Sequence, residues 1–533
     1  MLRLLICCLL FALHAAAATP GQADDGRSAP HRHPPQPPPQ PQPRILILGA
    51  GVAGVIAART LRERGLTDFV IVEARGEVGG RVRSGRPGDG AYTVEFGANW
   101  IQGNVNPILC LALKHGLKTV NNDIYGSITT YSDMGPEDFA DAITAADDAF
   151  SAIVANAGAQ LDERGPDLSV KVCGRRGRGI ADGGGCFERD FDLLTSYSQW
   201  DFEYAVPPAE SSWLASGWNN NLTYNLYGED NLLSVDQRGF KHFIQAEAAT
   251  FLQPHQIVYN ATVSSVDWSA PSRRLSDGST YAPREAAPPI IVTLANGTKL
   301  DADYVICTFS LGVLQNEDVG WVPGLPEWKR EAIAAFTMTT YTKVFVQFAG
   351  EDRFWFDTEM ALYASPRRGR YPLWQSLDVP SSHKPQFLPG SRILFGTVVG
   401  DDALDISALS GTTNEGVKED VREVLRDMFP NVTLPDFDVF YHDWAADPLF
   451  RGSYSNFPPS YDPALHRNLR ASVGHGRLRW AGEAGSAAWF GFLHGAYADG
   501  QATARELADC IQHNHCADDY VPRPRGPQAP VRG

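Results

Sequence analysis

The sequence has too few basic residues to present a broadly positive surface. Lysine and arginine together number 46, against 62 aspartates and glutamates, which gives a net charge of −16. A nucleic-acid partner normally requires a basic face, so this balance argues against one. The acidic field favours cationic ligands, although many soluble proteins are simply acidic.

Beyond its first residues the chain has no apolar run long enough to cross a bilayer. After Met1-Leu2-Arg3 comes an apolar stretch from Leu4 to Leu13, followed by small residues up to Ala18. A positive start, a short apolar core and small exit residues are typical of a secretory signal peptide, which we expect over residues 1–18. The C-terminus carries no lipid-anchor or retention signal. These features predict a secreted protein without a membrane segment, and a monomer is compatible with them.

Cysteine is scarce, and its spacing matches no zinc or iron–sulfur site, so we expect no metal. Close spacing favours two local disulfides, formed from the pairs Cys173 with Cys186 and Cys510 with Cys516. Cys110 and Cys307 lie in apolar stretches and are expected to be buried thiols. Four glycosylation acceptors agree with secretion: Asn221, Asn260, Asn296 and Asn431.

Residues 19–43 are rich in Pro, Gln and His and are expected to form a disordered linker. Residues 518–533 are expected to be a flexible tail. Between them, residues 136–215 favour helix and loop. Apolar patterning predicts helices over 55–64, 414–428 and 495–511, and strands over 45–48, 69–72, 257–263, 290–294, 304–308, 341–348, 393–399 and 478–481.

One motif joins the first two strands. Gly49, Gly51 and Gly54 form a G-x-G-x-x-G turn that follows a strand and opens a helix, and Glu73 ends the next strand. In this context the glycines permit a tight turn, close approach of a pyrophosphate and helix packing, while the acid accepts ribose hydroxyls. A dinucleotide site is therefore predicted, although the motif alone does not separate FAD from NAD.

Downstream segments resemble the flavin-containing amine oxidases from about Arg44 to Cys516. The resemblance rests on Glu73-Ala74-Arg75 with Gly79-Gly80-Arg81, Glu95 to Trp100, Phe309 to Leu314, Trp480 to Glu483, and Gly491 to Ala496. It implies non-covalent FAD as the cofactor. By family position, the residues beside FAD would be Arg81 and Glu483 near its phosphates or ribityl chain, Val263 near the adenine, and Trp100 and Trp444 bordering the flavin.

The resemblance also implies a reaction site. Tyr341 and Lys343 share one face of a predicted strand, and the family places this lysine, through a water, beside flavin N5. From pattern alone a surface lysine on an edge strand would be the better interpretation. Tyr454 and Phe492 would form an aromatic cage for the amine.

Among family members the secreted polyamine oxidases are most similar. A segment containing Glu203 resembles one that gives their substrate tunnel a carboxylate. Two departures stand out: Gln102 replaces a glutamate after Asn99-Trp100, and Phe492 replaces a tyrosine. A polycation could therefore bind more weakly, while the flavin chemistry should persist.

These patterns predict an α/β fold in which a Rossmann-like FAD-binding domain is built from discontinuous segments (44–130, 236–325 and 466–517). It is interleaved with an α+β substrate-binding domain of mixed sheet and helices (131–235 and 326–465). The leading hypothesis is a secreted FAD-dependent polyamine oxidase that uses O2 and releases aldehyde, amine and hydrogen peroxide. The alternatives are a flavin monoamine or L-amino-acid oxidase, and a flavin-free extracellular binding protein.

Overall fold

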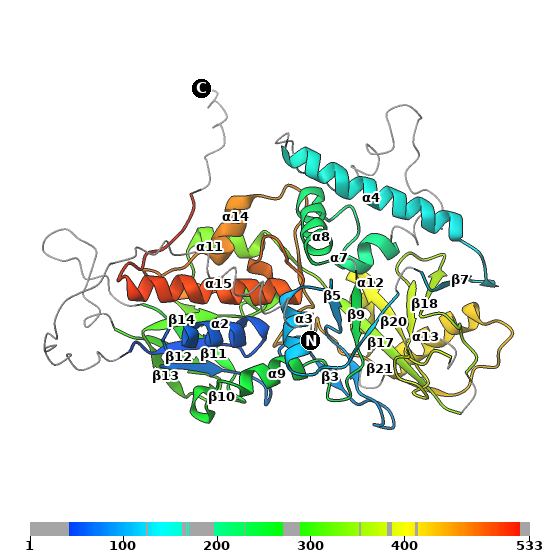
Figure 1. Ribbon diagram of the computed structural model, residues 1–533, viewed down its shortest axis with the longest axis horizontal. Helices are drawn as coiled ribbons and strands as arrows, with labels where there is room; N and C mark the ends of the chain where they lie inside the picture. Colours follow the sequence, from blue (N-terminus) through cyan, green and yellow to red (C-terminus); the bar gives the residue numbers. More distant parts are fainter. Residues whose placement is uncertain are drawn as a thin grey trace, which may run out of the picture.

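The computed structural model of the chain describes residues 42–123, 126–162, 167, 169, 197–228, 230–269, 288–350, 353–380, 386–410 and 414–522 (Figure 1). The predicted signal peptide, nearly all of the linker, and Cys173 with Cys186 lie outside these residues. Within them, no helix has the length and apolar character that a membrane crossing requires.

A five-stranded parallel sheet carries the predicted dinucleotide motif. Its strand order is β10-β2-β1-β14-β23, and every neighbouring pair runs parallel. The central strands β1 and β14 are buried along their whole length, as strands covered on both faces require. The sheet's strands come from distant parts of the sequence: β1 (Ile45–Leu48), β2 (Phe69–Val72), β10 (Ile257–Val258), β14 (Tyr304–Cys307) and β23 (Leu478–Trp480). The predicted discontinuous α/β fold is confirmed.

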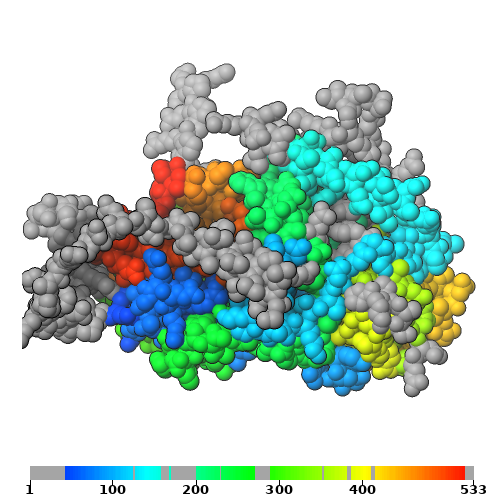
Figure 2. All heavy atoms as spheres, in the orientation of Figure 1, coloured from blue at the N-terminus to red at the C-terminus, as the bar shows by residue number. Residues whose placement is uncertain are grey.

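Two helices from opposite ends of the chain pack side by side against this sheet. They are α2 (Val52–Glu63) and α15 (Leu493–Gln512). In Figure 1 the blue α2 and the red α15 lie one above the other, and Figure 2 shows blue and red atoms in the same part of the surface. This packing brings the C-terminal segment beside the N-terminal glycine turn.

A second, seven-stranded sheet lies in the other half of the molecule (Figure 1), in the order β21-β17-β20-β19-β18-β7-β8. It is mixed, since β18 pairs parallel with β7 and the other pairs are antiparallel. The strands are β7 (Ile128–Ser132), β8 (Gly135–Pro136), β17 (Tyr341–Phe348), β18 (Met360–Ala364), β19 (Leu373–Ser376), β20 (Ile393–Val399) and β21 (Phe437–Phe440).

The amphipathic helix α13 (Glu415–Met428) covers part of this second sheet. It buries Val417, Val421, Val424 and Leu425, which recur at helical spacing and share one apolar cluster with residues of β17 and β20. This sheet therefore has its own core and holds β17, which carries Lys343, in a fixed position.

The described residues also form four smaller sheets. They are β13-β12-β11-β15, β5-β9-β6, β16-β22 and β3-β4. Their strands are β3 (Ser84–Gly85), β4 (Val94–Glu95), β5 (Trp100–Gln102), β6 (Thr119–Asn121), β9 (Asn231–Ser234), β11 (Val263–Asp267), β12 (Ile290–Leu294), β13 (Lys299–Ala302), β15 (Gly320–Val322), β16 (Thr337–Met338) and β22 (Ser455–Asn456). The remaining helices are α3 (Pro107–Lys114), α4 (Ala140–Asp162), α7 (Phe202–Tyr204), α8 (Trp213–Tyr227), α9 (His242–Ala249), α10 (Leu311–Gln315), α11 (Glu327–Ala334), α12 (Gly400–Ser410) and α14 (Pro463–Arg470).

The structure corrects the strand predicted over 257–263. This stretch divides between β10, in the parallel sheet, and β11, in the four-stranded sheet. Asn260 separates them with a φ of 53°, a left-handed conformation that takes the chain out of the first sheet. Apolar patterning could not reveal this turn, because asparagine adopts both conformations.

Two predicted boundaries also differ from what the structure shows. Strand β7 spans the boundary placed at residue 130, and β9 pairs with β5 and β6 although it was assigned to the other domain. The domain assignment itself stays a prediction.

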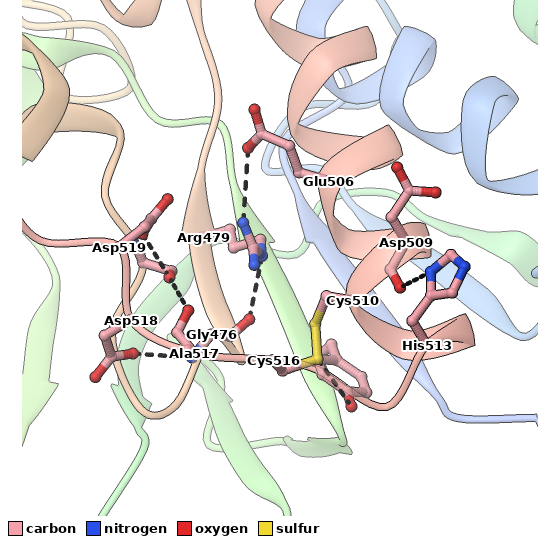
Figure 3. Close-up of a disulfide and its surroundings, with 12 residues drawn as sticks. Gly476, Arg479, Glu506, Asp509, Cys510, His513, Cys516, Ala517, Asp518 and Asp519 are labelled. Carbon is pink, nitrogen blue, oxygen red and sulfur yellow. Dashed lines mark hydrogen bonds and ion pairs between the residues drawn. A yellow bond between two sulfur atoms is a disulfide. The ribbon is translucent and has the colours of Figure 1, made fainter. Parts of the chain in front are cut away.

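The start of the predicted flexible tail is attached to the body (Figure 3). Asp518 and Asp519 accept hydrogen bonds from the backbone N–H groups of Gly476 and Ser472, at 2.8 Å and 2.6 Å. Arg479 lies between them and α15, donating to the Gly476 carbonyl and pairing with Glu506 at 3.6 Å. The chain therefore stays anchored past residue 517, later than the sequence predicted.

The predicted disulfide between Cys510 and Cys516 is confirmed at the end of α15 (Figure 3). Cys307 is a buried free thiol, as predicted. Cys110 is disulfide-bonded, which corrects its prediction as a free thiol, and its partner is not among the described cysteines. Since an apolar flank is equally compatible with a thiol and a disulfide, the sequence could not separate them.

The contact between α2 and α15 is close enough to require glycine at position 500. A Cβ added there would lie 2.4 Å from the Ala53 carbonyl oxygen. Gly500→Ala should therefore destabilise the protein by about 1–3 kcal/mol through overpacking, although the same change in an unobstructed helix would stabilise it. Thermal unfolding measures the loss. Gly324→Ala is the matched control, because a Cβ there meets nothing within 4 Å. Equal melting temperatures for the two variants would show that the contact between α2 and α15 does not limit the stability of the protein.

Candidate active site

A cavity of about 600 Å³ runs between the parallel sheet and the seven-stranded sheet. Its wall collects residues from both ends and the middle of the chain. Gly54 alone among the predicted cofactor- and substrate-contacting residues is not in the wall. Those that line it are Gly49, Gly51, Glu73, Arg81, Trp100, Gln102, Glu203, Val263, Tyr341, Lys343, Trp444, Tyr454, Glu483 and Phe492.

The glycine turn forms one end of the cavity. Gly49 has a φ of +110°, a conformation open mainly to glycine, and a Cβ on Gly54 would lie 2.0 Å from the Gly49 carbonyl oxygen. Gly54 therefore acts indirectly, by letting α2 pack against its own turn. No side chain caps the N-terminus of α2, and its first turn carries no acid. Its free N–H groups and positive potential thus face the cavity.

Glu73 holds this turn from the next strand. Its carboxylate accepts hydrogen bonds from the backbone N–H groups of Ala50 and Arg75, at 2.7 Å and 2.8 Å. Burial raises the pKa of the carboxyl, and these hydrogen bonds oppose that effect. Glu73 therefore both fixes the turn and presents acceptor capacity to a ligand.

Glu483 joins the C-terminal segment to the glycine-rich segment. Its buried carboxylate accepts from Arg81 at 2.8 Å, from the Ser455 hydroxyl at 2.6 Å and from the Gly491 N–H at 2.8 Å. Arg81 also donates to the Ser453 carbonyl, so part of its donor capacity is already used by the protein. The pair therefore shapes the middle of the cavity and leaves Arg81 half-buried beside it.

Lys343 is buried on β17, with 3% of its surface exposed. Its Nζ donates to the carbonyls of Glu95 and Gly97, at 3.0 Å and 2.6 Å, and to Asn99 Oδ1 at 2.7 Å. Burial lowers its pKa to about 7, while the nearby Glu95 carboxylate opposes the shift. The surface interpretation is thus excluded, and this amine can change charge near neutral pH.

Aromatic side chains surround the end of the cavity next to Lys343. The Tyr341 ring lies 5.9 Å from that of Tyr454 and 5.7 Å from that of Phe202. Phe492 stacks on the buried His494, with ring centroids 4.8 Å apart. Glu203 lies in the same wall, and Tyr454 donates to its backbone carbonyl at 3.0 Å. These rings form a binding surface suited to an amine.

Burial raises the pKa of Glu203 to about 7. Gln102 lines the cavity from β5 and is half-buried. Trp444 is buried and packs edge-on against His442, with ring centroids 4.4 Å apart. The wall around Lys343 thus combines the titratable Glu203 carboxyl, the neutral Gln102 amide and several aromatic rings.

Sequence reasoning gave no role to Asn99, Ser455 or His494, although each lies in or next to a segment quoted for the resemblance. Asn99 contacts Lys343, Ser455 contacts Glu483, and His494 supports Phe492. Their partners come from distant segments, so only the folded chain reveals them. Their position inside the motifs that carry the family resemblance is the sequence feature that could have identified them.

The residues present fit an FAD. The N-termini of α2 and α15 both lie at the cavity and neither has a side-chain cap. Gly482 offers open space there, since an added Cβ would meet nothing within 4 Å. Two uncapped helix N-termini suit the phosphates and an electron-rich ring, and Glu73 suits a ribose.

The chain is similar to known flavin enzymes over most of its length. Residues 52–508 match the family model of flavin-containing amine oxidoreductases. The chain is 30% identical to polyamine oxidase 1 of Zea mays, over 89% of this chain and 92% of that protein. It is 32% identical to polyamine oxidase 7 of Oryza sativa subsp. japonica, over 86% of this chain and 93% of that protein.

A solved structure shares the fold. It is a putrescine oxidase variant redesigned in its cofactor binding, with a TM-score of 0.63 and 19% identity, covering 87% of this chain and 99% of that one. Family membership excludes the flavin-free binding protein as an interpretation. The chain belongs to the flavin-containing amine oxidase family and is an FAD-dependent amine oxidase.

Proposed function

We propose that this enzyme oxidises polyamines of the spermine and spermidine type, using O2 and releasing an aldehyde, an amine and hydrogen peroxide. Relatives named polyamine oxidases, aligned over most of their length, support this substrate class. The observation that carries the proposal is the state of the Glu203 carboxylate.

Within the described residues, the carboxylates that line the cavity belong to Glu73, Glu203, Asp318 and Glu483. Backbone N–H groups hold Glu73, Arg81 and Ser455 hold Glu483, and Arg451 binds Asp318 with two contacts of 2.9 Å. Among the residues that the structure describes, none pairs with the Glu203 carboxylate in this way. An unpaired carboxylate in an aromatic wall is suited to a distant ammonium group of a polyamine.

The role of the protein in the reaction is to position the substrate and to keep its reacting nitrogen uncharged. FAD held by Glu73, Arg81 and Glu483 would supply the hydride-accepting chemistry and the reduction of O2. Tyr341, Tyr454 and Phe492 would orient that carbon, and Glu203 would hold the far end of the substrate. Lys343, facing the same space, would hold a proton below pH 7 and release it above.

The charges along the wall favour a polyamine over the alternatives. An L-amino acid needs an arginine for its carboxylate, but the arginines that line the cavity, Arg75 and Arg81, bind Gly80 and Glu483. A monoamine would leave Glu203 unused. Neither alternative gives the unpaired carboxylate a role.

Secretion and non-covalent FAD belong to the same proposal. The N-terminal pattern supports secretion, together with the disulfides of Cys110 and of Cys510 with Cys516. Asn260, Asn296 and Asn431 are exposed, as glycosylation requires, and Asn221 is partly buried on α8. No described cysteine lines the cavity, which supports non-covalent binding.

Glu203→Gln tests the substrate class. Removing the charge while keeping the shape should raise the KM for spermidine at least tenfold and change the KM for benzylamine little, since a monoamine has no second ammonium. The reciprocal variant Gln102→Glu should lower the KM for spermidine. Steady-state peroxide release measures both. An unchanged spermidine KM in Glu203→Gln would contradict the role of this carboxylate.

Lys343→Met tests the proton-holding role. Flavin reduction in the wild type should depend on the ionisation of Lys343 near pH 7 in addition to that of Glu203, whereas the variant should keep only the Glu203 ionisation, with FAD still bound. Because the folded-state pKa lies below the ordinary value of 10.5, folding releases a proton between these values. Wild-type stability should therefore rise with pH from about 7 to 10.5, relative to Lys343→Met. Identical pH profiles for flavin reduction and for melting would remove Lys343 from the account.

A further inference from the structure

The surroundings of the Lys343 amine contain one more acceptor than a neutral amine can use. Nζ lies within hydrogen-bond distance of the Glu95 carbonyl, the Gly97 carbonyl and Asn99 Oδ1, at 2.6–3.0 Å. An ammonium has three N–H donors and fills all three acceptors. A neutral amine has two N–H donors and a lone pair, so one of these oxygens would face that lone pair.

The two backbone carbonyls can only accept, and they suit the two N–H donors that both charge states possess. Asn99 differs, because its side-chain amide carries an acceptor on one side and a donor on the other. A half-turn of this amide replaces Oδ1 with Nδ2 and offers an N–H to the lone pair. Asn99 is buried, with 4% of its surface exposed, and it lines the same cavity as Lys343.

We propose that Asn99 is the positioning residue that holds Lys343 in one place in both charge states, by reversing its side-chain amide when the lysine loses its proton to water. The proposal rests on the placement of Lys343 at the reaction site. A carboxylate at position 99 could accept but not donate, and an apolar side chain could do neither.

The other groups around Lys343 do not provide this adaptation. Trp100 and Phe395 lie with ring centroids 4.9 Å and 5.8 Å from Nζ, and such rings favour the charged form alone. Glu95 is the carboxylate that faces it from β4; it is held by Ser84 and the Phe240 N–H and also feels Lys241. On its own strand, burial raises the pKa of Tyr341, which stays neutral.

The test is the ionisation of Lys343 in substrate-free holoenzyme, followed by the 13Cε resonance of labelled lysine. The chain has few lysines, and Lys343→Met assigns the signal. This measurement needs no turnover, so its result is independent of which amine the enzyme oxidises. Asn99→Asp should raise the midpoint by at least one pH unit. Asn99→Leu should change the midpoint by no more than about half a pH unit, because the charged and the neutral lysine both lose a hydrogen-bond partner.

The outcomes separate this role from that of a plain acceptor. If Asn99 only accepted from the ammonium, Asn99→Leu would lower the midpoint by a unit or more, and that result would overturn the proposal. So would an unchanged midpoint in Asn99→Asp. Asn414→Asp, at the N-cap of α13 and away from the cavity wall, is the control for added charge. Asn99→Ala replaces the leucine variant if the latter fails to retain FAD or melts early.

Discussion

The packing of α15 on α2 is the contact on which the rest of the site depends. The glycine turn at the start of α2 and the Glu483 segment before α15 are separated by more than four hundred residues, yet they form adjacent parts of one wall. Gly500 lets the helices approach until the Ala53 backbone lies against it. Because both helix N-termini lie at the cavity, the same contact directs two positive helix ends towards one ligand.

The charges of the cavity are ordered along its length. Near the glycine turn and the middle, the carboxylates are held by backbone N–H groups, arginine or serine, so they shape the wall. At the far end the Glu203 carboxylate is unpaired, and Lys343 is buried among carbonyls and rings. Desolvation moves the pKa of both groups to about 7, from opposite directions. The end proposed for the substrate is thus the part of the cavity in which charge is most easily changed by a bound cation or by pH.

Much of this arrangement could be predicted from the sequence, for physical reasons. The strands of the parallel sheet are short apolar runs bounded by turn residues, and the Gly49–Gly54 turn has a pattern that few other structures require. The amphipathic α13 has a clear helical period, and the strand that carries Lys343 is a long run rich in β-branched and aromatic residues, buried from Thr342 to Phe348. Family resemblance then supplied the predicted roles of Lys343 and Glu483, which pattern alone would have left as a surface lysine and an ordinary acid.

What the sequence could not give depends on contacts between distant segments. The turn at Asn260 depends on a backbone conformation that apolar patterning does not reveal. The disulfide of Cys110 depends on which other cysteine lies near it in the folded chain. Residues 518 and 519 read as a polar tail because their partners, Gly476 and Ser472, are donors contributed by another loop. Asn99 lay within a quoted motif, yet its contact with Lys343 exists only once β17 has folded against the loop after β4.

The most direct test of the account is a peroxide-release screen of the purified, FAD-loaded protein. It would compare spermine, spermidine, their N-acetyl forms, monoamines and L-amino acids, with the products identified to show which C–N bond breaks. The account predicts a higher kcat/KM for spermine or spermidine than for any monoamine or L-amino acid, since a monoamine has no second ammonium group to place at Glu203. Turnover confined to a monoamine or an L-amino acid would contradict it.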